Sequence, residues 1–172
     1  MSANCSDLFS DQFDGERALK HIQNQVEFGP RILSNPEAKK QTLDYMEEHL
    51  RPFATRTTRQ SFSFKDLEGV NLWATFVSDH QNANQNRLML GAHWDTRPFA
   101  DRDTQNINLP IIGANDGASG VGVLLEIARM IQKDSLKIDT QFVRNVFTFG
   151  VARVLHRPNK HGHKTEVYSQ GS

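Results

Sequence analysis

Residues 88–95 read Leu-Met-Leu-Gly-Ala-His-Trp-Asp, and residues 113–128 read Gly-Ala-Asn-Asp-Gly-Ala-Ser-Gly-Val-Gly-Val-Leu-Leu-Glu-Ile-Ala. The first stretch is an apolar run of strand length that ends at a histidine and an aspartate. The second is a glycine-rich turn that leads into an amphipathic helical pattern. Because open α/β sheets bind ligands at the carboxyl ends of their strands, the two stretches together predict a metal site there.

The flanking sequence predicts the rest of an α/β fold. Asp14 and Asn35-Pro36 are typical helix starts, and the segment before Pro52 is a typical helix end. A strand, a long loop, a helix and a further strand form a crossover unit, which favours a largely parallel sheet. The apolar run at 88–92 suits a central strand covered on both faces. The expected elements are helices over about 15–27 and 36–51, antiparallel strands over 54–64 and 70–78, a strand over 88–92, a helix over 117–133 and a strand over 142–149.

Apolar residues at helical spacing predict which faces of these helices are buried. The expected inner positions are Ala18, Leu19, Ile22 and Val26 in the first helix, Leu43, Met46 and Leu50 in the second, and Val121, Leu124, Leu125, Ala128 and Ile131 in the third.

Composition limits the partners. The chain has 172 residues, and its 20 Lys and Arg balance its 20 Asp and Glu, so charge gives no reason to expect nucleic acid or an anionic membrane. A single cysteine, Cys5, excludes an internal disulfide and a Cys-rich zinc module. We expect no signal peptide and no membrane span, because neither a basic start nor a run of about 18 apolar residues is present. The sequence does not identify the cellular compartment.

His93 and Asp95 are two residues apart, so in an extended strand their side chains point to the same side. A carboxylate beside a histidine fixes its tautomer, an arrangement found behind metal-bound imidazoles. A His-x-Asp triplet alone is weak evidence. Asp116 has two interpretations: it, or Asn115, caps the helix that follows, or it turns its carboxylate to a cation such as zinc.

The loop from 96 to 113 is long and without regular structure, which favours a substrate-rim loop. Arg97 and Arg102 either serve that rim or pair with Asp101 and Asp103 on the surface. Trp94 and Phe99 either form an apolar wall or pack in the core. Upstream, Phe28-Gly29-Pro30-Arg31 is interpreted as a helix stop.

Taken together, Gly-Ala-His-Trp-Asp-Thr-Arg-Pro at 91–98 and Pro-Ile-Ile-Gly-Ala-Asn-Asp-Gly-Ala-Ser-Gly at 110–120 resemble the zinc exopeptidase superfamily of aminopeptidases and glutaminyl cyclases. The His-Trp-Asp-Thr-Arg-Pro wording and the upstream Phe-Gly-Pro-Arg look most like bacterial relatives of the glutaminyl cyclases. The resemblance covers about 15–149. It implies a three-layer α/β/α fold with a mixed, mostly parallel sheet, and a peptide or protein N-terminus as substrate.

The resemblance also implies roles for three residues. Asp116 matches a direct zinc ligand. His93 matches a ligand of a second metal in two-zinc aminopeptidases, or a neighbour of the single zinc in cyclases, and Asp95 orients it. In the cyclase reaction, zinc polarises the amide of an N-terminal glutamine while an acid/base carboxylate moves the proton, forming pyroglutamate and ammonia.

The sequence departs from the family pattern after the last predicted strand. The pattern continues into two acidic residues, a general acid/base and a zinc ligand, whereas residues 151–155 read Val-Ala-Arg-Val-Leu, and after Asp139 the only acid is Glu166. We interpret 1–150 as the N-terminal half of the family domain and 151–172 as an aberrant, disordered tail of a truncated or frameshifted chain. Its three histidines are less favoured as substitute ligands; they are His156, His161 and His163.

Three hypotheses follow. The first is a glutaminyl-peptide cyclotransferase-like zinc enzyme, inactive or incomplete in this chain. The second is a zinc aminopeptidase of the same superfamily, and the third is a non-catalytic remnant or binding module. One zinc ion is expected for a cyclase and two for an aminopeptidase.

Overall fold

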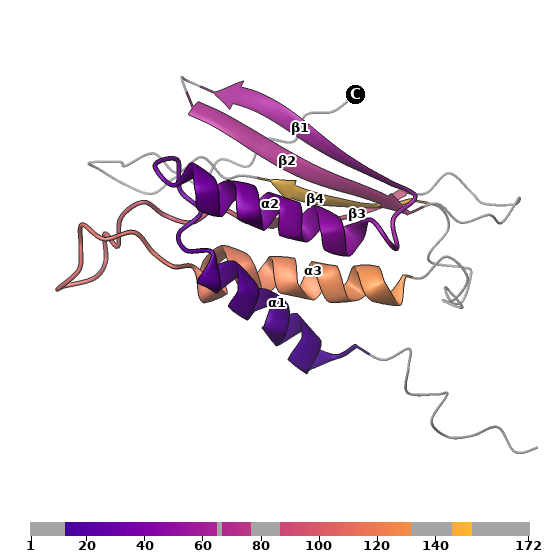
Figure 1. Cartoon of the computed structure of the whole chain (residues 1–172), viewed down its shortest axis with the longest axis horizontal. Helices are drawn as coiled ribbons and strands as arrows, with labels where there is room; N and C mark the ends of the chain where they lie inside the picture. Colours follow the sequence, from indigo (N-terminus) through magenta and orange to yellow (C-terminus); the bar gives the residue numbers. More distant parts are fainter. Residues whose placement is uncertain (1–12, 65–66, 77–86, 132–145, 153–172) are drawn as a thin grey trace, which may run out of the picture.

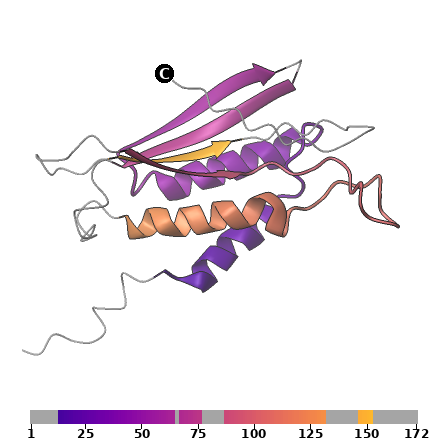
Figure 2. The ribbon, with the colours of Figure 1, turned by 180° about the vertical axis from the view of Figure 1, so that it is seen from behind.

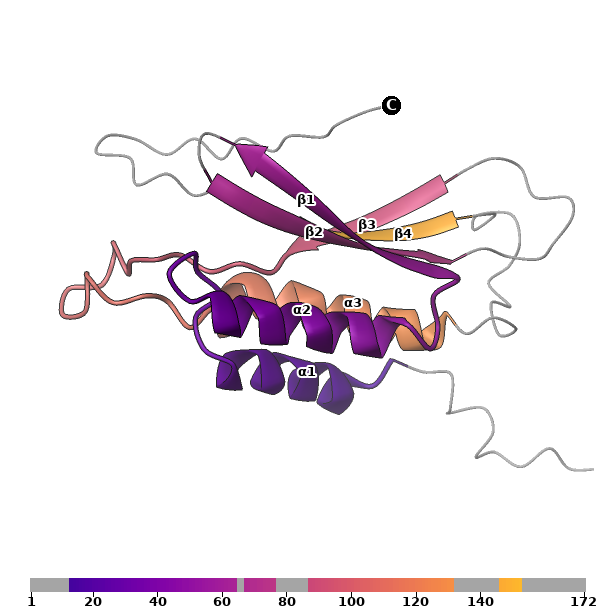
Figure 3. The ribbon, with the colours of Figure 1, turned by 45° about the horizontal axis from the view of Figure 1, so that its top comes forward.

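Helices α2 and α3 lie against one face of a four-stranded sheet in the computed structural model of the chain, and α1 packs on α3 from the outer side (Figures 1 and 3). The structure describes residues 13–64, 67–76, 87–131 and 146–152. Within these ranges no helix is long and apolar enough to cross a membrane.

The first two helices begin where their caps predict. α1 spans Gly15–Glu27, and the Asp14 carboxylate accepts a hydrogen bond from the Arg17 amide. α2 spans Pro36–Leu50, and the Asn35 side chain accepts from the Ala38 amide. Each cap satisfies one of the amides that a helix start leaves without an internal partner.

The sheet has the strand order β1-β2-β4-β3. β1 (Arg56–Phe64) and β2 (Leu67–Phe76) form the predicted antiparallel hairpin, with strand bounds that differ from the prediction by at most three residues. β2 also pairs antiparallel with β4 (Val146–Ala152), and β4 pairs parallel with β3 (Arg87–His93). The crossover from β3 through α3 (Ser119–Met130) to β4 therefore produces the parallel neighbours that the sequence predicts.

The expectation that residues 88–92 form a central strand is not met in the described part. β3 is the last strand in the order, and Met89 is 63% exposed. Alternate residues of this strand point to opposite faces of the sheet: Leu90 and Ala92 pack against the core, whereas Met89 points away from it.

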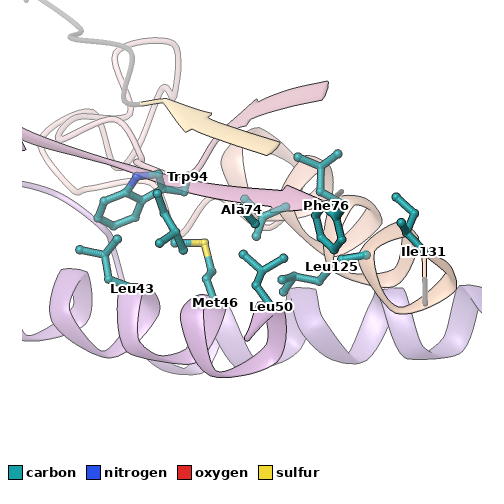
Figure 4. Close-up of a cluster of buried hydrophobic side chains, with 12 residues drawn as sticks. Leu43, Met46, Leu50, Ala74, Phe76, Trp94, Leu125 and Ile131 are labelled. Atoms are coloured by element: carbon teal, nitrogen blue, oxygen red, sulfur yellow. The ribbon is translucent and has the colours of Figure 1, made fainter. Parts of the chain in front are cut away.

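The core lies between the sheet and the two helices beneath it (Figure 4). All the predicted inner residues of α2 and α3 are buried. α1 differs, because Leu19 is 47% exposed while His21 and Gln25 are buried beside Ala18. The stripe of α1 is thus partly polar, since this helix packs on other helices and not on the sheet. The core cluster comprises Leu43, Met46, Leu50, Leu72, Ala74, Phe76, Trp94, Val121, Leu124, Leu125, Ala128 and Ile131.

The predicted α/β class and mixed sheet are confirmed. In the described part, however, two strand pairings are antiparallel and one is parallel, and the helices all lie on one side of the sheet (Figures 1 and 3). β4 continues through Val151 and Ala152, so the first two residues assigned to the tail are strand. Residues 153–172, which include the three tail histidines, lie outside the described residues.

Candidate metal centre

The carboxyl end of β3 delivers the first two predicted site residues. His93 is the last residue of the strand, and Asp95 follows in the extended segment after it. In the parallel register, the residue beside His93 on β4 is Ala152. The residue type at this register position is therefore not one whose side chain binds metal ions.

A five-residue turn, η1 (Ala114–Ala118), delivers the third residue, Asp116. Gly113 before the turn has φ 69°, and Gly117 within it has φ 109°, a conformation that residues with a Cβ rarely adopt. A Cβ on Gly117 would lie 2.8 Å from the Asp95 carbonyl oxygen, so the turn packs directly on the strand exit.

The capping alternative for this turn is not what the structure shows. The N-cap of α3 is Ala118, and no side chain bonds to the free amides there. The contact of Ser119 in this turn is a hydrogen bond that its hydroxyl donates to the Asn115 carbonyl, 2.6 Å away. The Asp116 carboxylate is therefore available to face the strand end.

His93, Asp95 and Asp116 meet at this edge of the sheet. Nε2 of His93 lies 3.1 Å from Oδ1 of Asp116. Nδ1 of His93 lies 3.2 Å from the backbone carbonyl of Asp95 and 3.6 Å from its carboxylate. Hydrogen bonding to Asp95, opposed by burial and aided by the charges of both aspartates, raises the pKa of His93. Asp95 thus contacts the ring, with its carbonyl closer than its carboxylate.

The two carboxylate oxygens of Asp116 face different partners. Oδ1 faces His93, while Oδ2 lies 3.6 Å from Nε of Arg97. Nη1 of Arg97 also contacts the Asp101 carboxylate at 2.6 Å, which confirms the predicted surface pair. Asp103 instead accepts hydrogen bonds from the amides of Gln105 and Asn106 and so closes a turn.

The loop between the two motifs projects from the molecule (Figures 1 and 2) and is closed by its own backbone. The Ala100 amide donates to the Leu109 carbonyl, and the Ile111 amide donates to the Arg97 carbonyl. Phe99 is 48% exposed on this loop, whereas Trp94 is fully buried in the core. Trp94 therefore anchors the strand exit, with its indole N–H donating to the Val70 carbonyl.

Arg31 is a site-related residue that the sequence interpretation as a helix stop does not predict. It is fully buried, and its guanidinium donates to backbone carbonyls close by in the chain and to those of two segments distant in sequence. The accepting residues are Gln25, Gly29, Trp94, Ile112 and Gly113. No local pattern announces such a role, and only its place in the Phe-Gly-Pro-Arg resemblance marks Arg31 from sequence.

The donor atoms fit part of a zinc site. Their separation of 3.1 Å is close to the roughly 3.3 Å between two ligands on one tetrahedral zinc with bonds of about 2.0–2.1 Å. Within the described residues, however, no group of three or more His, Cys, Asp or Glu side chains could hold a metal. Since zinc sites use three or four protein ligands, His93 and Asp116 supply a portion of the set.

Comparison with known proteins agrees with this fold. Residues 71–148, which include β3, the turn and α3, match the model of Peptidase family M28. The match confirms the predicted resemblance to the zinc exopeptidase superfamily.

Its solved relatives divide between two activities. The chain is similar to a glutaminyl cyclase from Tannerella forsythia, with 34% identity and a TM-score of 0.67 over 81% of this chain and 46% of that one. It is also similar to a Zn-dependent exopeptidase from Parabacteroides distasonis, with 30% identity and a TM-score of 0.70 over 90% and 52%. Both of the hypothesised enzyme classes are thus represented among its relatives.

The chain spans about half the length of these solved relatives. Among curated proteins it is 28% identical to the uncharacterized protein YfbL of Escherichia coli (strain K12), over 74% of this chain and 37% of that one. The matched part therefore corresponds to one portion of a longer relative.

Proposed function

We propose that the chain carries the histidine–aspartate half of a glutaminyl cyclase-type zinc centre, with Asp116 as a zinc ligand. The observation that carries the proposal is the 3.1 Å approach of His93 Nε2 and Asp116 Oδ1 at the carboxyl end of β3. The resemblance to the Tannerella forsythia cyclase supports the cyclising activity for a whole protein of this type. Its substrate would be a peptide or protein with an N-terminal glutamine.

The residues of this chain prepare the donor atoms. A proton on Nδ1 of His93, donated to the Asp95 carbonyl, would leave Nε2 free to bind a metal ion shared with the Asp116 carboxylate. When bound, zinc would supply Lewis-acid polarisation of the substrate amide. The closure of the turn on the strand exit holds the two donors together before any metal arrives, so little reorganisation is needed.

The same geometry supports incompleteness in this chain. Ala152 occupies the β4 position level with His93, and the next residues are Arg153, Val154 and Leu155. Residues 151–155, where the family pattern places the general acid/base and a further ligand, contain no carboxylate. We therefore expect weak metal binding and no turnover from the 172-residue chain by itself.

An aminopeptidase-type centre with two zinc ions is the second candidate. It is favoured by the position of His93, whose Nε2 is close enough to Oδ1 of Asp116 for both atoms to bind one metal ion. It is also consistent with the resemblance to the Parabacteroides distasonis exopeptidase. The third reading, a non-catalytic binding module, would keep the fold and lose any metal dependence.

Zinc binding of the purified chain by equilibrium dialysis tests the proposal. Asp116→Ala should abolish the bound zinc, whereas Asp44→Asn, on α2 and paired with Lys40 and Arg59, should leave it unchanged. Unchanged binding in Asp116→Ala would remove this residue from the site. Tight stoichiometric zinc in the wild-type chain would contradict its incompleteness.

Substrate assays separate the two enzyme candidates. Ammonia release from a peptide with N-terminal glutamine reports cyclase activity, and cleavage of an aminoacyl anilide reports aminopeptidase activity. The assays need the chain as it stands and a fusion to the remaining part of a cyclase relative. Two zinc ions with anilide cleavage in the fusion would overturn the cyclase assignment.

A further inference from the structure

Arg31 lies in the segment between α1 and α2 and is fully buried, although arginine is rarely found in protein interiors. Burial lowers its pKa to about 10, against the opposing effect of the Asp95 and Asp116 charges, so the side chain remains a cation at neutral pH. Within the described residues no ion pair joins it to a carboxylate. Its partners are backbone carbonyls.

Those carbonyls belong to both halves of the site. Nε donates to the Trp94 carbonyl at 3.1 Å, and Trp94 is the residue between His93 and Asp95. Nη1 donates to the Ile112 carbonyl at 2.7 Å, and Nη2 donates to the Gly113 carbonyl at 2.8 Å. The latter two precede the turn that carries Asp116. One planar guanidinium thus spans the strand exit and the start of the turn.

The backbone around the guanidinium is closely packed. A Cβ on Gly113 would lie 3.0 Å from Nη2 of Arg31, and one on Gly117 would lie 3.3 Å from the same atom. The turn can therefore approach Arg31 only because these positions are glycine. In return, the Thr96 amide donates to the Arg31 carbonyl at 3.3 Å, so the strand exit is tied to this segment twice.

We propose that Arg31 is the positioning residue of the centre, setting the spacing of His93 and Asp116 by holding the two backbone segments that carry them. The expected effect of Arg31 on metal affinity rests on the proposed metal-binding function. Its effect on the spacing of His93 and Asp116 also holds for the protein without metal. Arginine is required because its five N–H donors reach several carbonyls in one plane, whereas the ammonium of lysine has three donors at one point.

Arg31→Met and Arg31→Lys test this through metal affinity, measured by competition of Zn²⁺ or Co²⁺ with a chromogenic chelator. We expect affinity to fall by about tenfold to a hundredfold in Arg31→Met, as when the support behind a ligand is removed, and by less in Arg31→Lys. Met46→Ala is the matched control, since it destabilises the core away from the site and should leave affinity unchanged. Equal losses in all three variants would reduce Arg31 to a stability residue.

A second readout does not depend on metal. In the apoprotein, amide NMR shifts and hydrogen exchange should change in Arg31→Met at 94–97 and 113–117 while those of α2 stay as in the wild type. Guanidinium at low millimolar concentration should partly restore both readouts in Arg31→Ala, and sodium chloride at the same ionic strength should not.

The two readouts separate the possible failures. If wild-type chain shows no Asp116-dependent metal binding but the local shifts appear, the proposed function fails and the positioning role stands. If the shifts spread over the whole chain, if guanidinium restores nothing, or if both Arg31→Met and Arg31→Lys unfold, the positioning role is overturned.

Discussion

The core beneath the sheet and the polar edge beyond β3 are held together by different means. The core consists of side chains from α2, α3 and β2 that exclude water and need no particular partner (Figure 4). The edge consists of a strand exit and a turn whose backbones are joined by Arg31 and by close glycine contacts. Trp94 belongs to both, because its indole packs in the core while its carbonyl accepts from Arg31.

Protein stability and the geometry of the site are therefore coupled through few residues, such as Trp94. A core residue can be replaced by another of similar size with modest loss. A residue of the edge cannot be replaced in this way, because it acts through a hydrogen bond or close contact with one particular atom. Substitutions should therefore separate into those that lower stability alone and those that also change the approach of His93 and Asp116.

Trp94→Ala should have the largest effect, since Trp94 contributes to both the core and the edge. Removing a fully buried indole leaves a cavity and an unpaired Val70 carbonyl, which costs about 3–5 kcal/mol of unfolding free energy. Urea unfolding measures this loss. Trp94→Phe is the control that keeps much of the volume, and a loss equal to that of the alanine variant would show that packing is not the main contribution.

A polar cluster inside the helical layer is expected to make stability depend on pH. His21 is buried, with its Nδ1 2.7 Å from the Tyr45 hydroxyl and its ring 5.1 Å from that of His49. Burial first, and then the nearby charge of His49 and of Arg17 against that of Glu126, lower the pKa of His21 to about 4. The folded protein therefore keeps this histidine neutral.

The sign of the pH effect follows from the pKa values in the two states. Between about pH 6.5 and 4 the unfolded chain binds a proton that the folded chain does not, so stability falls as pH falls through this range, by on the order of 3 kcal/mol. Urea unfolding across this range measures it, and His21→Gln should flatten the dependence. An unchanged slope in that variant would assign the acid sensitivity to other groups.

Much of the core was predictable because it is periodic. The five predicted positions of α3 and the three of α2 are all buried, and both N-terminal caps form. α1 is the exception: Leu19 is exposed and Ile22 and Val26 are only half-buried, because this helix packs on helices and buries His21 and Gln25. Spacing identifies a face but cannot say what that face packs against.

The edge was predictable only where the metal-ligating residue types stand in short sequence motifs. His93, Asp95 and Asp116 converge as their motifs suggest, and their roles at a metal stay predictions. Arg31 contacts carbonyls 63 and 82 positions away in the chain, and no local pattern encodes such contacts. Met89 shows the same limit, because an apolar run does not say whether both faces of a strand are covered.

Gly117→Ala should have an intermediate effect and act on the edge alone. The residue has φ 109°, and a Cβ there would meet the Asp95 carbonyl oxygen at 2.8 Å. The strained conformation should cost about 1–3 kcal/mol. Zinc affinity should fall as well, because the turn that carries Asp116 must move. Gly15→Ala, at a position where nothing lies within 4 Å of the added Cβ, is the control and should change neither quantity appreciably.

Arg59→Ala should have the smallest effect, since Arg59 lies outside both the core and the edge. The Arg59 guanidinium joins β1 to α2 through ion pairs of 2.7 Å with Asp44 and with Glu47. These groups are partly exposed, so water and salt screen the pairs, and the loss should be at most about 1 kcal/mol. It should shrink further at high salt, where screening is stronger. A loss of several kcal/mol, or one independent of salt, would show that the hairpin depends on this arginine as the edge depends on Arg31.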